Sequence, residues 1–235
     1  MTKLLYQDDS YLKEFDTNVV SVDGNKIELE RTVFYPEGGG QPGDVGVLNS
    51  NGADYNVVGV KKENGKIMHE LGNEGLKKGD KVKGAIDWQR RYKFMRMHTA
   101  SHSLAAIFNK ESGALITGNQ IGEEQTRFDF NLENFDRELI DKLVEMTNKL
   151  MAQGKPVNIS YKSREEAMQI PAVVKLAKGL PESIKTLRLV EIEGIDLQAD
   201  GGTHVRNTSE VGNIKVERLE NKGKNNRRIY FSLAK

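Results

Sequence analysis

Two short stretches about a hundred residues apart hold three of the four histidines in this chain. The first is His98-Thr99-Ala100-Ser101-His102, and the second is Asp200-Gly201-Gly202-Thr203-His204. If both belong to one site, the fold must bring these distant parts of the chain together. We therefore interpret the two stretches as halves of one metal site.

The spacing within each stretch suits metal binding. His98 and His102 stand four apart on a predicted helix, so both imidazoles project from one face, one turn apart. The same spacing also arises by chance between unrelated exposed residues. Asp200 and His204 are again four apart, and the two glycines between them let a loop curl until both side chains face one point. Together the stretches offer three nitrogen donors and one carboxylate, a set that zinc accepts.

Residue types that are absent narrow the chemistry. The chain has no cysteine, which excludes disulfides, thiolate ligands and a cysteine nucleophile. No glutamate stands between His98 and His102, so the helix lacks the general base of a zinc peptidase. Because a carboxylate is a harder ligand than a thiolate, Asp200 could also admit manganese or cobalt. His69 has no such neighbours, and we interpret it as an ordinary strand residue.

Residues 17–86 have a β pattern. Short strands flank the turn signals Asp23-Gly24-Asn25 and Glu63-Asn64-Gly65, and no long helical period interrupts them. This pattern is typical of a small barrel or sandwich. Between two prolines stand three adjacent glycines, at 38–40, which suit either a wide turn or the close approach of a ligand or another backbone.

A helical period replaces the strand period at Asp87, the expected N-cap, and continues to Gly113. The elements predicted beyond it are strands at 114–121, 126–130, 157–161 and 186–192, helices at 134–153 and 172–178 with a short one opening at 163, and a hairpin at 213–233. We therefore expect a β domain at 1–86 and an α+β domain with a mostly antiparallel sheet at 87–235.

Charge alone does not indicate a nucleic-acid partner. The formal net charge is +1, so the chain has no global basic field. Three local basic clusters, at 77–83, 89–96 and 222–228, suit either a solvated face or phosphate contacts. No apolar run approaches the length of a membrane helix, and the N-terminus turns acidic too early for a signal peptide. We expect the cytoplasm as the location and no membrane partner.

Three motifs occur in order along the chain. They are Thr32-Val-Phe-Tyr-Pro-Glu-Gly-Gly-Gly-Gln-Pro-Gly-Asp44, then the stretch at 98–102, then Asp200-Gly-Gly-Thr-His-Val205 with Asn207-Thr208. Together they resemble the editing domain of alanyl-tRNA synthetase, and in particular its free-standing form, the AlaX type of alanyl-tRNA editing protein. The resemblance covers nearly the whole chain. It implies an N-terminal β-barrel carrying the glycine motif, followed by a two-layer α+β editing domain with zinc.

The resemblance also implies an activity and a set of residues. Such proteins act in trans as deacylases, hydrolysing the ester of serine, and in some members glycine, wrongly attached to alanine tRNA. The implied metal ligands are His98, His102, Asp200 and His204, although the family usually has cysteine at the position of Asp200. The expected catalytic residues are Thr117, where the family places a polar pocket residue, and Gln120 as its alternative; either would bind the serine hydroxyl. The residues expected to bind substrate are Gly38, Gly39, Gly40, Gln41, Arg90, Arg91 and Thr99.

Two other functions stay open at this point. One is a metal-stabilised tRNA-binding module without catalysis, and the other is a different metal-dependent ester hydrolase on the same scaffold. For the editing function the expected partner is mischarged alanine tRNA, and not DNA. The metal would either activate a water or anchor the amino group or terminal ribose of the substrate.

Overall fold

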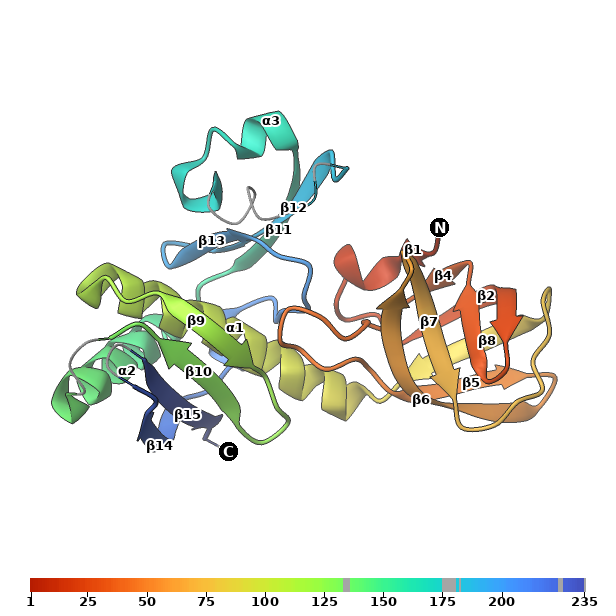
Figure 1. Cartoon of the computed structure of the whole chain (residues 1–235), viewed down its shortest axis with the longest axis horizontal. Helices are drawn as coiled ribbons and strands as arrows, with labels where there is room; N and C mark the ends of the chain where they lie inside the picture. The colour runs from red at the N-terminus through yellow and green to blue at the C-terminus, as the bar shows by residue number, and fades with distance from the viewer. Residues whose placement is uncertain (133–135, 175–180, 182, 224–225, 235) are drawn as a thin grey trace. The chain divides into compact units, whose positions relative to one another are not determined.

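The computed structural model describes residues 1–132, 136–174, 181, 183–223 and 226–234. The chain folds into two compact units, Met1–Phe94 and Met95–Lys235. The strand pattern ends with β8 (Lys81–Ile86), and α1 (Trp88–Ser112) follows directly (Figure 1). The helix α1 therefore begins in the first unit and continues into the second. Within the described ranges, no helix is long and apolar enough to cross a membrane.

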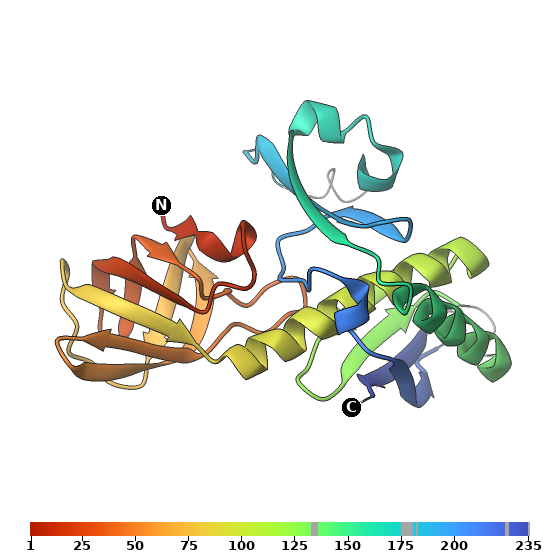
Figure 2. The same cartoon turned by 180° about the vertical axis from the view of Figure 1, so that it is seen from behind.

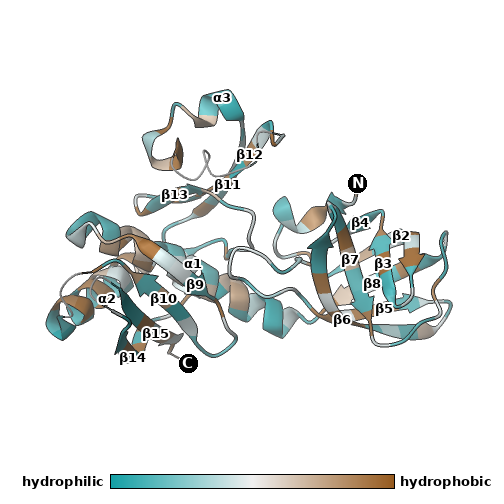
Figure 3. Cartoon of the chain, viewed as in Figure 1, coloured by the Kyte–Doolittle hydropathy of each residue, from teal (hydrophilic) through white to brown (hydrophobic). Residues whose placement is uncertain are grey.

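The first unit is a closed antiparallel barrel, which confirms the expected β-barrel. Its strand order is β2-β3-β7-β6-β5-β8. The further bounds are β2 (Glu14–Asp23), β3 (Lys26–Leu29), β5 (Gly46–Ser50), β6 (Ala53–Glu63) and β7 (Lys66–Leu71). Hydrophilic and hydrophobic residues alternate along these strands, as Figure 3 shows, so one side of each strand fills the barrel. Outside the closed order, β1 (Lys3–Leu4) pairs in parallel with β4 (Arg31–Thr32), and η1 (Leu5–Gln7) follows β1.

Both predicted hairpin turns are present. Gly24 joins β2 to β3 with φ of 57°, and Asn64 and Gly65 join β6 to β7 with φ of 50° and 80°. The strand after the first turn, β3, ends at Leu29, and the chain then leaves the barrel order to pair with β1. The strand β5 was not predicted.

A buried ion pair joins the first turns of α1 to the barrel. The Arg91 side chain has no exposed surface, and its guanidinium donates to the carboxylate of Asp44. It also donates to the carbonyl oxygens of Ser10, at 3.0 Å, and Val33, at 2.6 Å. The Asp44 carboxylate accepts in addition from the Tyr35 N–H, at 2.6 Å. Because every partner is hydrogen-bonded, the pair avoids the large cost of an isolated buried charge.

The second unit contains two antiparallel sheets, in agreement with the predicted α+β class. The four-stranded sheet has the order β14-β15-β10-β9, and the three-stranded sheet has the order β11-β12-β13. Their bounds are β9 (Ile116–Gln120), β10 (Thr126–Phe130), β11 (Val157–Ser163), β12 (Thr186–Ile192), β13 (Asp196–Ala199), β14 (Ile214–Asn221) and β15 (Arg227–Leu233). Figures 1 and 2 show α1 and α2 (Arg137–Met151) on the same face of the four-stranded sheet. There Phe108 of α1 stacks on Phe130 of β10, with ring centroids 4.6 Å apart.

Side-chain caps set the helix ends. Asp87 caps α1 by accepting from the Arg90 N–H at 3.0 Å, and Gly113 ends the helix with φ of 71°. Asp136 caps α2, and a capping box at Ser163 opens α3 (Arg164–Ala167), as predicted. A further 3-10 turn, η2 (Thr208–Glu210), follows the stretch from Asp200 to His204.

Some predicted elements lie partly outside the described residues. Residues 172–174 of the predicted helix at 172–178 are helical, and 175–178 are outside the described ranges. The same holds for positions 134–135 of the predicted helix at 134–153 and for 224–225 of the C-terminal hairpin loop.

One histidine lies in the barrel core. The His69 ring has no exposed surface, its Nε2 lies 2.9 Å from Thr32 Oγ1, and Phe34 packs edge-on at 5.6 Å between centroids. Burial lowers the pKa of His69 from 6.5 to about 4. The imidazole is therefore neutral near pH 7.

Because the unfolded chain protonates His69 near pH 6.5 and the folded barrel only near pH 4, folding stability should fall as pH falls between these values. The expected loss from this residue between pH 7.5 and pH 4.5 is about 2.5 kcal/mol. His69→Gln keeps a hydrogen-bonding group towards Thr32 but removes the titration. Urea unfolding at both pH values should show a smaller pH dependence in the variant than in the wild type by this amount. Equal pH dependence in the two proteins would contradict the assignment.

Candidate metal centre

The helix α1 supplies the first two donors. His98 and His102 lie one turn apart on it, with ring centroids 4.9 Å apart, and both side chains are buried. The helical period thus places them as predicted.

The chain that follows β13 supplies the other two donors, Asp200 and His204. Gly202 lies against the His98 ring, because a Cβ at this position would lie 2.1 Å from His98 Cε1 and 2.4 Å from Nδ1. Gly201 has open space around it. The two glycines therefore have different roles: Gly202 is required by close approach, whereas Gly201 is not.

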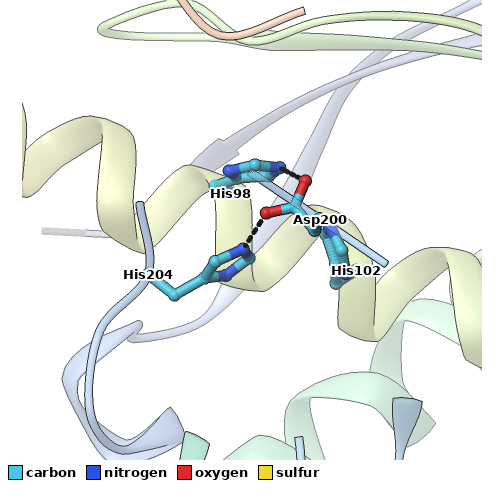
Figure 4. Close-up of side chains that lie close together, drawn as sticks. All are labelled: His98, His102, Asp200 and His204. Carbon is cyan, nitrogen blue, oxygen red and sulfur yellow. Dashed lines mark hydrogen bonds and ion pairs between the residues drawn. The ribbon is translucent and has the colours of Figure 1, made fainter. Parts of the chain in front are cut away.

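The four side chains converge on one point (Figure 4). One ligand atom from each of His98, His102, Asp200 and His204 can be chosen so that all lie within 4.8 Å of one another. An Asp200 carboxylate oxygen lies 3.1 Å from His204 Nε2, and the other lies 3.8 Å from His98 Nε2. Donors on a tetrahedral zinc ion at about 2.1 Å lie roughly 3.4 Å apart, so small side-chain rotations suffice. The donor set and its spacing fit such an ion.

The protonation states also favour a cation. Burial, and then the neighbouring His204, hold the pKa of His98 well below its usual value, and burial lowers the pKa of His204 to about 4. Burial alone would raise the pKa of Asp200, but the adjacent histidines lower it well below its usual value. Neutral imidazoles and an ionised carboxylate are the forms that bind metals.

Two side chains orient the histidines from behind. His102 Nδ1 lies 2.9 Å from an Asp196 carboxylate oxygen, and His204 Nδ1 lies 3.1 Å from Thr99 Oγ1. Each contact leaves Nε2 as the donor towards the cluster. Burial opposes a charge on His102, but the Asp196 hydrogen bond raises its pKa overall. Such outer contacts fix the tautomer and the ring orientation of a metal-bound histidine.

Asp196 and Arg188 were missed in the sequence analysis. Asp196 is itself held by the Gln198 side-chain amide, at 3.1 Å. The Arg188 guanidinium donates to the Asp200 carbonyl oxygen at 2.8 Å and lies 3.8 Å from its carboxylate. For Asp196, the only signal in the sequence was an acidic residue four positions before Asp200.

Thr117 and Gln120 lie on β9, the edge strand of the four-stranded sheet, and both are exposed. The register shifts between Asp129 and Phe130, so Thr117 stands at a β-bulge, and its hydroxyl lies 3.5 Å from Asn226 Oδ1. Bulges recur beside active sites, where they redirect a side chain. The catalytic role assigned to these two residues remains a prediction.

The other expected substrate residues, Thr99 apart, lie in the first unit. The backbone N–H groups of Gly38 and Gln41 each donate to the carbonyl oxygen of the other residue. Between them, Gly39 and Gly40 have φ of 58° and 86°. This is a tight two-residue turn that needs the left-handed region twice. The guanidinium carbon of Arg90 lies over the Phe94 ring, 4.6 Å from the ring centroid. Their substrate contacts remain predictions, and a contact by the buried Arg91 would require its ion pair to open.

Comparison with family models gives two matches. Residues 7–90 match the model for class II (A) tRNA synthetases, and residues 187–230 match the second additional domain of threonyl and alanyl tRNA synthetases. The second match contains Asp200 and His204.

Relatives that match nearly the whole chain point to the same group of proteins. The alanyl-tRNA editing protein AlaX-M of Methanosarcina barkeri is 52% identical over 100% of both chains, and that of Saccharolobus solfataricus is 48% identical over 99% of both. The alanine–tRNA ligase of Thermoplasma acidophilum is 36% identical over 98% of this chain, which spans 27% of the ligase.

Gly202→Ala should displace the His98 ring and so lower the zinc content of the purified, zinc-loaded protein, because the new methyl group would overlap that ring. Gly201→Ala is the matched control, since a methyl group there meets no neighbour within 4 Å. Elemental analysis measures both. Full zinc content in the Gly202 variant would show that His98 is not held as described.

Asp196→Ala should lower zinc affinity by roughly 10- to 100-fold, because His102 loses the group that fixes its orientation. Asp196→Asn, which keeps an acceptor oxygen, should recover part of that loss. Glu191→Ala removes an exposed carboxylate from the same sheet and serves as the control. Competition with a chromophoric chelator measures the affinities; equal values for all four proteins would refute an orienting role.

Proposed function

The chain belongs to the family of alanyl-tRNA editing proteins, and on this premise we propose that it is a trans-editing deacylase that hydrolyses seryl-tRNA, and also glycyl-tRNA, formed on alanine tRNA. The observation that carries the proposal is the convergence of three imidazoles and a carboxylate within 4.8 Å in a chain with this full-length identity.

We further propose that the resident metal is one zinc ion held by His98, His102, Asp200 and His204. Bound there, zinc would supply a positive charge able to lower the pKa of a water or to anchor the substrate. The donor chemistry supports this, because Asp200 contributes one negative charge, as a thiolate would, and the imidazoles of His98 and His204 are neutral. The carboxylate also admits manganese or cobalt.

The residues of this chain position the reaction. An aminoacyl ester is already activated, so the site must orient it, admit one water and stabilise the oxyanion. Asp196 holds the proton at His102 Nδ1, and Thr99 holds His204, so both rings keep one orientation. Thr117, with Gln120 as the alternative, would bind the serine hydroxyl, and alanine would then leave that polar group without a partner. Gly38, Gly39, Gly40, Gln41, Arg90 and Arg91 would contact the tRNA.

The test is release of amino acid from alanine tRNA charged separately with serine, glycine or alanine. Zinc-loaded protein should release serine fastest and alanine slowest. His102→Ala should lower the rate by on the order of 100-fold or more, because it removes a metal ligand. Lys149→Gln, an exposed change on α2, should leave the rate unchanged.

Each failure would indicate one rival. Tight tRNA binding without release would indicate a binding module without catalysis. Equal release of all three amino acids, or of simple esters, would indicate a different ester hydrolase. An unchanged rate in His102→Ala would remove the metal from the reaction.

A further inference from the structure

The four-stranded sheet has a second face that carries polar side chains. Along β10 and β15 the buried residues alternate with others that point away from α1 and α2: Phe128, Phe130, Ile229 and Phe231 are buried, whereas Arg127, Arg228 and Tyr230 keep exposed surface. Figures 1 and 2 show both helices on the opposite face. In Figure 3, β10 and β14 are mostly hydrophilic.

Strand register arranges these side chains in two rows, which we call the open face. In the first row, Gln120 pairs with Arg127, Arg127 with Tyr230, and Tyr230 with Arg218. The second row comprises Gly118, Asp129, Arg228 and Glu220, paired in the same way. Residues that pair across adjacent strands project from the same side of the sheet.

Positive charge exceeds negative charge on this face. Arg228 donates two hydrogen bonds to the Asp129 carboxylate, of 2.6 and 3.0 Å. The Glu220 carboxylate forms ion pairs with both Arg218, at 3.0 Å, and Lys222, at 2.7 Å. Lys215 and Glu217, at the end of the face, pair with each other at 3.4 Å. Five cations and three carboxylates leave a charge of +2. Among the described residues, Arg127 has no ion-pair partner within 4.0 Å, so its charge stays available.

The first row is also preorganised. The Arg218 guanidinium lies over the Tyr230 ring, 4.1 Å from its centroid, while 58% of its side-chain surface remains exposed. The ring limits the conformations of the arginine without neutralising it. Arg127 and Arg218 stand two strands apart, or roughly 10 Å at the usual strand spacing. Two cationic side chains on backbones at that spacing suit successive charges along an extended polyanion.

We propose that the open face binds the phosphodiester backbone of RNA, with Arg127 and Arg218 contacting phosphates. The choice of tRNA as the RNA rests on the proposed function. Arg127 and Arg218 lie across the sheet from α1, which carries His98 and His102, so their contacts are remote from the metal centre. Gln120 projects from the same face as Arg127, which favours Thr117 over Gln120 as the residue that binds the serine hydroxyl. Such contacts stabilise bound substrate and transition state equally, and they should change affinity rather than the rate at saturation.

The test is the affinity of the zinc-loaded full chain for uncharged alanine tRNA over a range of salt concentrations. Arg127→Gln/Arg218→Gln should raise Kd by about tenfold and lower the slope of log Kd against log salt by about two. The matched control is Arg137→Gln/Lys149→Gln, which removes the same charge from exposed positions on α2. It should leave the slope unchanged. Release of serine at saturating tRNA should be the same in all three proteins.

A Kd and slope equal to those of the wild type would overturn the proposal. Because Arg218 is largely exposed, the single variant Arg218→Gln provides a second test that should leave folding intact, with about half the change in slope. Unchanged tRNA affinity with lost affinity for polyglutamate would also overturn it, in favour of an acidic protein partner. If the wild type binds tRNA but releases no amino acid, the proposed function fails, and the binding measurements still decide the role of the open face.

Discussion

Three imidazole rings can share one buried space only if they do not all become charged, and the metal centre depends on that constraint. The ring centroids lie 4.3 to 4.9 Å apart. Two protonated rings at that distance would repel by about 4 kcal/mol even at an effective dielectric constant of 20. Burial keeps His98 and His204 neutral, and the carboxylates of Asp196 and Asp200 supply negative charge in direct contact with the rings. A single divalent cation suits this balance better than protons do.

Two structural constraints fix the positions of the four donors in the metal centre. Helix geometry sets the spacing of His98 and His102, and close contact with Gly202 sets the approach of the other two donors. In the first unit, the Arg91–Asp44 pair ties the first turns of α1 to the chain that follows the glycine turn. A charge buried this deeply is costly to break from its partner, by about 3–5 kcal/mol. The pair is therefore a structural feature, and the substrate contact expected of Arg91 from the family resemblance would require this pair to open.

Features with a local cause could be predicted from the sequence. Helical spacing indicated the histidine pair, glycine turns indicated the hairpins of the barrel, and Asp87 indicated the start of α1. Features with a distant cause could not. Asp196 reaches His102 across 94 positions, and Arg91 reaches Asp44 across 47. The rows of the open face depend on the register of four strands, and sequence periodicity indicates which residues share a face but not which residues stand opposite one another.

The shared helix has a consequence for how the chain can be divided. The boundary between the units falls between Phe94 and Met95, within the continuous helix α1 that runs from Trp88 to Ser112. A gene fragment cut at that point would leave Trp88–Phe94 of the 25-residue helix with one product and the longer remainder with the other, each with a frayed end. The barrel product would keep Arg91 near a new terminus, and the other would begin at Met95, three residues before His98. The two compact units therefore cannot be separated at this boundary without breaking a helix to which both contribute.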